Sequence, residues 1–166
     1  MVSVRRLGVA CFAWCVLFGT ALHAQRPALR DFDSFVLERS SCYGTCPAYR
    51  LELDHDGRVV FESLNPEDAG RTEEARIDSL NVWGLWIFAL HMHFAELPDN
   101  IEGSFFCPGG GFDAPHVTVT VNTKHGEKHV RDFLVCANAP EALRILEDSL
   151  DRVANSKRWI RPRKER

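Results

Sequence analysis

Beyond residue 24 the sequence lacks a long uncharged apolar run, and it lacks the common signatures of an enzyme. It has no Gly-x-Ser-x-Gly, no His-Glu-x-x-His and no phosphate loop ending in Gly-Lys-Ser/Thr. An excess of basic charge is also missing, because 20 Lys and Arg face 23 Asp and Glu. We therefore expect no catalytic residue, no cofactor, no bound metal and no nucleic-acid partner.

The N-terminus has the three-part layout of a secretory signal peptide. Arg5 and Arg6 form a short basic start, and residues 7–22 are apolar or small without any charge. Cleavage is expected after Ala24, or after Ala21 one turn earlier. The apolar stretch is shorter than the ~20 residues that span a bilayer, so an uncleaved anchor is the less favoured alternative. The sequence thus predicts a bacterial protein exported to the periplasm or the cell exterior, without a transmembrane segment after cleavage.

The expected organisation after the signal peptide (residues 1–24) is a single folded unit. Residues 25–33 are predicted to be a linker, residues 34–160 one domain and residues 161–166 a basic tail. A chain of this length buries about two thirds of its unfolded surface. Such a domain can build a core without disulfides, so any disulfides would add stability or carry function.

Four cysteines remain once the signal peptide is removed: Cys42, Cys46, Cys107 and Cys136. An even number of cysteines in an exported chain favours two disulfides, for which three connectivities exist. A bond between Cys42 and Cys46 requires a turn, which Gly44 permits. Cys136 follows a predicted hairpin, and Cys107 precedes the same hairpin. We favour the pairs 42–46 and 107–136 over the crossed alternatives.

Alternating apolar residues predict five strands, joined partly by tight turns. The strands are expected at residues 34–38, 48–53, 58–62, 116–122 and 128–135. Asp56-Gly57 and His125-Gly126 are typical turn dipeptides, and they predict two β-hairpins. Residues 65–71 and residues 100–115 are expected to be loops.

Three- and four-residue spacing of apolar residues predicts two helices, at residues 77–94 and 139–153. The expected core stripe of the first helix is Leu80, Trp83, Ile87, Leu90 and Phe94, and that of the second is Leu143, Leu146, Leu150 and Val153. Gly84 lies mid-helix, where it could let a strand or an aromatic ring approach closely. The order strand, hairpin, helix, hairpin, helix predicts an α+β fold. We expect an antiparallel sheet of about five strands, with both helices packed on one face.

The segment from Cys42 to Tyr49, Cys-Tyr-Gly-Thr-Cys-Pro-Ala-Tyr, resembles a motif of an exported bacterial family catalogued as domain of unknown function 6438. Weaker matches are Asp113-Ala114-Pro115 before a valine-rich strand, Lys128 after the next turn and Trp159 after the last helix. The resemblance covers about residues 34–160. It implies the α+β domain and export, and it implies no activity.

The pair Cys42 and Cys46 has three possible roles: a structural disulfide, a thiol–disulfide exchange pair, or a copper clip. Redox pairs usually enclose two residues and lie at a helix N-terminus. The spacing Cys-x-x-x-Cys-Pro resembles the Sco family of copper chaperones, in which a helix follows the motif. Here Tyr49, Leu51 and Leu53 predict a strand instead. We favour the structural disulfide and keep the redox or copper role as the alternative.

The function that this sequence favours is a non-enzymatic binding or structural protein of the cell envelope, with an envelope protein as a possible partner. Its candidate contact surface is the loop at residues 103–115, which carries Phe105 and Phe106. The aromatic flank of the first helix, Trp83 or Trp86, is the second candidate.

Overall fold

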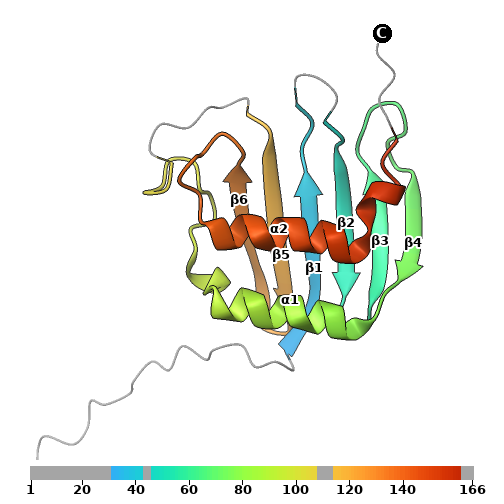
Figure 1. Ribbon diagram of the computed structural model, residues 1–166, viewed down its shortest axis with the longest axis horizontal. Coiled ribbons are helices and arrows are strands. Elements are labelled where there is room, and N and C mark those ends of the chain that lie inside the picture. Colours follow the sequence, from blue (N-terminus) through green and yellow to red (C-terminus); the bar gives the residue numbers. More distant parts are fainter. Residues whose placement is uncertain (1–30, 43–45, 108–113, 162–166) are drawn as a thin grey trace, which may run out of the picture.

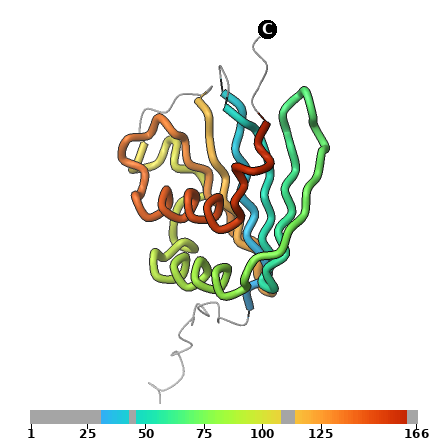
Figure 2. The backbone as a smooth tube through the Cα atoms, turned by 45° about the vertical axis from the view of Figure 1, so that its right-hand side comes forward, coloured from blue at the N-terminus to red at the C-terminus, as the bar shows by residue number. Residues whose placement is uncertain are grey.

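The computed structural model describes residues 31–42, 46–107 and 114–161 (Figure 1). The predicted signal peptide, most of the predicted linker, Gly44 and all but the first residue of the predicted basic tail lie outside these ranges. The described chain forms one antiparallel sheet with the strand order β4-β3-β2-β1-β5-β6. Figure 2 shows both helices on the same side of this sheet, so the predicted α+β architecture is confirmed.

The sheet has six strands, one more than the five strands assigned from the sequence and in line with the expected number of about five. The strands are β1 (Phe32–Arg39), β2 (Tyr49–Asp54), β3 (Arg58–Ser63), β4 (Thr72–Arg76), β5 (His116–Thr123) and β6 (Gly126–Phe133). The helices are α1 (Ser79–His91) and α2 (Glu141–Ala154), with short 3-10 helices η2 (Phe94–Glu96) and η3 (Ser156–Arg158). The sequence-based assignment missed β4, an edge strand with the sequence Thr-Glu-Glu-Ala-Arg. A charged edge strand discourages pairing with other chains, but it lacks the apolar alternation that identifies buried strands.

One face of the sheet forms the core, and the other is open to solvent. The alternation predicted for β2 and β5 is confirmed, because Leu51, Leu53, Val119 and Val121 are all buried under the helices. β1 begins at Phe32, two residues earlier than expected, and the ring of Phe32 stacks on that of Trp86 at 5.1 Å between centroids. This arrangement is the usual one for an antiparallel sheet that has a single covered face.

The buried face of α1 differs from the predicted one. The helix buries Val82, Leu85, Trp86 and Ala89, whereas Leu80 of the expected stripe is 73% exposed and Ile87 is 43% exposed. Since apolar residues surround most of this helix, their spacing did not select one face. The helix also ends at His91 rather than at Phe94, because His93 adopts a left-handed conformation (φ 57°) before η2.

The expectation that Gly84 allows a close approach is wrong. Gly84 is exposed, and no atom would lie within 4 Å of a Cβ added there. We therefore predict that Gly84→Ala raises the free energy of unfolding by about 0.5–1 kcal/mol, because alanine is the better helix former. Urea denaturation measures the change.

Gly57→Ala is the matched control for this substitution. Gly57 lies in the β2–β3 turn with φ +87°, and an added Cβ would clash with the carbonyl oxygen of Ile77. This variant should lose stability. A destabilised Gly84→Ala protein would contradict the absence of a contact at that position.

Candidate functional site

The cysteines lie in the two pairs of the favoured connectivity. Cys42 and Cys46 have an S–S distance of 1.97 Å, and Cys107 and Cys136 have one of 1.98 Å. The first pair is half-buried between the end of β1 and the start of β2, whereas Cys136 is fully buried. Tyr49 opens a strand three residues after Cys46, so the described residues that follow this cysteine do not form the helix N-terminus that lowers thiol pKa values in redox motifs.

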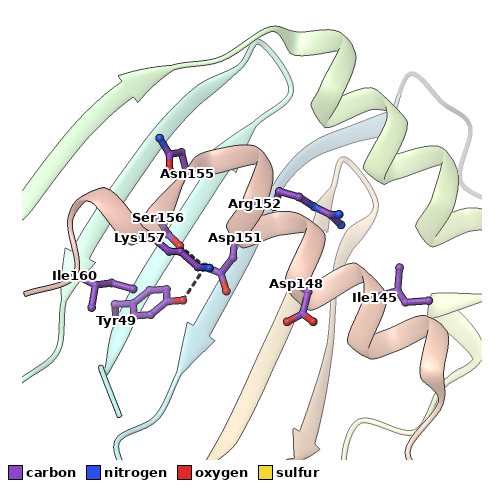
Figure 3. Close-up of a pocket in the computed structure, with 9 residues that line it drawn as sticks. All are labelled: Tyr49, Ile145, Asp148, Asp151, Arg152, Asn155, Ser156, Lys157 and Ile160. Carbon is purple, nitrogen blue, oxygen red and sulfur yellow. Dashed lines mark hydrogen bonds between the residues drawn. The ribbon is translucent and has the colours of Figure 1, made fainter. Parts of the chain in front are cut away.

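A polar cluster lies between the sheet and the end of α2, centred on Asp151. The Arg39 Nε donates to Asp151 Oδ2 at 2.7 Å, and the Tyr49 hydroxyl donates to Oδ1 at 2.6 Å. The Ser156 hydroxyl also donates to Oδ1 at 2.6 Å (Figure 3). Arg39 and Tyr49 are cross-strand partners in β1 and β2, so the sheet register presents both side chains to the helix. Asp151 therefore ties two strands to α2 and η3.

The pocket in Figure 3 opens beside this cluster and has a volume of about 610 Å³. The cluster residues Tyr49, Asp151 and Ser156 form part of its lining. The rest of the lining consists of Ile145, Asp148, Arg152, Asn155, Lys157 and Ile160. Burial and the neighbouring Asp151 carboxylate raise the pKa of the Tyr49 hydroxyl, so the phenol stays protonated at neutral pH. Because three donors already occupy Asp151, the cluster is better suited to holding the fold together than to proton transfer.

A second polar group lies deeper under α2, and sequence reasoning missed it. Asp132 on β6 is fully buried and accepts a hydrogen bond from Arg144 Nε at 3.1 Å. Arg144 Nη2 donates to the Cys136 carbonyl oxygen at 2.6 Å. Glu147 is also buried. In the sequence of α2 it comes four positions after Leu143 and three positions before Leu150. The predicted core stripe of this helix did not include Glu147, although residues at three- and four-residue spacing lie on the same helix face, and that spacing was the available signal.

An apolar groove of about 820 Å³ lies between the end of α1 with η2 and the tip of the β5–β6 hairpin. Its apolar lining includes Trp86, Ile87, Leu90, Phe94 and Val121. The polar residues around it include His91, His125, Glu127 and Lys128. An apolar interior with a few polar groups at its edge is typical of a binding surface.

The aromatic residues expected to form a contact surface divide into two groups. Phe105 is 93% exposed, and Phe106 is partly buried. Trp86 is buried, contrary to the expectation of an exposed flank, and Trp83 packs partly against the core. Residues 108–113 of the predicted contact loop lie outside the described ranges. The large apolar side chains that α1 exposes are thus Leu80 and Ile87 rather than the tryptophans.

Within the described ranges, no three His, Cys, Asp or Glu residues lie close enough together to hold a metal ion. In the same part of the chain, no helix is long and apolar enough to cross a membrane.

Comparison with protein-family models identifies the family of this chain. No curated protein matches the chain. The model of a family described as a domain of unknown function (DUF6438) matches residues 33–154, which run from the start of β1 to the end of α2. This match covers most of the chain, and it confirms the resemblance inferred from the Cys42–Tyr49 segment. The chain belongs to the DUF6438 family.

Proposed function

We propose that this domain is an exported, non-enzymatic binding protein of the cell envelope. Its ligand would be a polypeptide partner that inserts aliphatic or aromatic side chains into the groove at the end of α1. The observation that carries this proposal is that α1 exposes two large apolar side chains, Leu80 and Ile87, and that Ile87 also lines the apolar groove. Covering such a surface removes apolar area from water, which favours association by about 25 cal/mol per Å² before the costs of binding.

The composition of α1 supports a contact role. Ser79–His91 contains no Asp, Glu, Lys or Arg, so a partner could cover this helix without desolvating a charge. A surface helix that serves only to cover a sheet usually carries charged residues on its outer face. The charged groups lie instead at the groove edge, on Glu96, Glu127 and Lys128, where they would set orientation and specificity.

Two cysteine pairs at bonding distance support the exported location. Disulfides persist in the periplasm and outside the cell, and they are rare in the reducing cytosol. Export also fits the predicted signal peptide at residues 1–24. The proposed compartment is therefore the periplasm or the cell exterior.

Site-specific photocrosslinking in intact cells tests the binding role. A photoreactive residue at position 87 should give a protein adduct, and one at Thr118 on the open face of the sheet should give none. With the photoreactive residue moved to position 80, Ile87→Asp should lower the adduct yield about tenfold, because the partner would have to bury a charge. Equal adduct formation at positions 87 and 118, or none at 87, would refute the proposal.

The alternative is a thiol-redox or copper-handling protein that uses Cys42 and Cys46. The observation in its favour is that both residues are only half-buried, so reductant or metal could reach them. The strand β2 that follows Cys46 argues against this alternative. In thiol-redox motifs and in the Sco copper chaperones, a helix follows the cysteine motif instead. We therefore keep the binding role as the main proposal.

A further inference from the structure

The centre of the α2–sheet interface contains two carboxyl groups that lack a full set of hydrogen-bond partners. Glu147 on α2 is 2% exposed, and Asp132 on β6 is 0% exposed. Glu147 Oε1 and Asp132 Oδ1 are both buried, and neither has a hydrogen-bond partner in the described chain. A buried carboxylate oxygen without a hydrogen-bond donor lowers the stability of the folded protein. Such a group usually stays protonated and therefore uncharged.

The neighbouring cations are already engaged with other groups. Arg39 on β1 pairs with Asp151 and Asp148, and Arg144 on α2 donates to Asp132 and to the Cys136 carbonyl oxygen. The helix α1 packs against α2 and contributes no Asp, Glu, Lys or Arg. Tyr49 on β2 donates to Asp151. Three carboxyl groups, on Glu147, Asp132 and Asp151, thus face two guanidinium groups. Within the described chain no donor reaches Glu147 Oε1.

We propose that Glu147 and Asp132 form a buried carboxyl pair that retains one proton at neutral pH, and that losing this proton in alkaline solution loosens α2 from the sheet. The bound proton removes the repulsion between two carboxylates in a site that water does not reach. Its loss leaves two negative charges beside two guanidinium groups, Arg39 and Arg144, that already pair with other acceptors or with Asp132. The end of α2 nearest Asp151 is held by other contacts, so the loosening begins around Glu147 and Arg144.

Burial, with the Asp132 carboxylate as the second cause, raises the pKa of Glu147 from 4.5 to about 8. Burial also raises the pKa of Asp132, although Arg144 opposes this shift. Between pH 4.5 and about 8 the unfolded chain releases the Glu147 proton while the folded protein keeps it. Stability therefore falls as the pH rises through this window, and the full penalty is present above the folded-state pKa.

Urea denaturation at a series of pH values, comparing the wild type with Glu147→Gln, tests the proposal. Glutamine has the shape of a protonated glutamate and cannot ionise. The gap between the urea midpoints of the variant and the wild type should widen from pH 4.5 to about 8 and then stay constant. Glu127→Gln, at an exposed position of the β5–β6 hairpin, should follow the wild-type profile. Parallel profiles for the wild type and Glu147→Gln would overturn the proposal.

Infrared spectroscopy of the folded wild type tests the proton itself, even if the glutamine variant fails to fold. A protonated carboxyl C=O band should be present at neutral pH and should disappear in alkaline solution. Hydrogen exchange of the α2 amides should speed up over the same pH interval by more than the intrinsic pH dependence of exchange. A neutral-pH spectrum without the protonated band would show that both carboxyl groups are ionised, which is incompatible with the pair.

Discussion

Replacing Cys107 and Cys136 together by alanine is expected to lower the free energy of unfolding by about 3.6 kcal/mol. The two residues are 29 positions apart, so their bond restricts a long loop in the unfolded chain. Alanine is the appropriate substitute at position 136, because this side chain is buried and a hydroxyl there would need a partner. Urea denaturation of the oxidised wild type and of the double variant measures the difference.

The matched control is the double alanine variant of Cys42 and Cys46. Their separation is only four positions, so the expected loss is about 2 kcal/mol. The order of the two losses is the informative result. Equal losses, or a larger loss for the short loop, would show that Cys42–Cys46 does more than close a turn.

The same pair of variants bears on the redox alternative. If mass spectrometry finds the 42–46 bond intact under mild reductant, and the fully reduced protein does not bind copper, the redox and copper roles fail. A bond that opens reversibly while 107–136 stays closed would instead favour them, since labile disulfides are typically the catalytic or regulatory ones.

Asp151→Ala is expected to lower the free energy of unfolding by about 3 kcal/mol, which is typical of removing one partner from a buried ion pair. Three donors lose their acceptor at once: Arg39, Tyr49 and Ser156. The Arg39 side chain is only 20% exposed, so water compensates poorly for the lost carboxylate. Urea denaturation at neutral pH measures the effect.

Asp148→Ala provides a control on the same helix with the same cation. Asp148 lies 3.4 Å from Arg39 Nη2, but its side chain is 79% exposed, so its loss should cost less than about 0.5 kcal/mol. A double-mutant cycle of Asp151→Ala with Tyr49→Phe should show a cost below the sum of the two single costs. Similar losses for Asp148→Ala and Asp151→Ala would mean that the cluster does not hold α2 to the sheet.

Local patterning predicted most of the fold. The Val117, Val119 and Val121 alternation identified β5, and the spacing of Leu143, Leu146 and Leu150 identified the buried face of α2. Both predictions were correct because one face of each element is apolar and the other is polar. Without that contrast the sequence pattern misled: the charged strand β4 was missed, and the wrong face of α1 was assigned to the core because this helix is apolar on most sides.

The candidate site was only partly accessible to the same reasoning. Phe105 was identified as a contact candidate and is exposed, whereas Trp86 is buried against Phe32. The groove at the end of α1 joins residues of that helix to residues of the β5–β6 hairpin, more than 25 positions later in the chain. A local sequence pattern does not predict this contact, because the contact depends on how the helix and the hairpin pack against each other.

The sequence by itself determined the α+β class, the hairpins and the family, since these follow from side-chain period, turn residues and the Cys42–Tyr49 motif. Only the tertiary structure decided which face of α1 is buried, that Asp151 gathers Arg39, Tyr49 and Ser156, and that Glu147 and Asp132 share a dry interface. The physical reason is that burial and charge pairing depend on neighbours distant in the chain. Period and propensity describe each segment alone, and they carry no information about what packs against it.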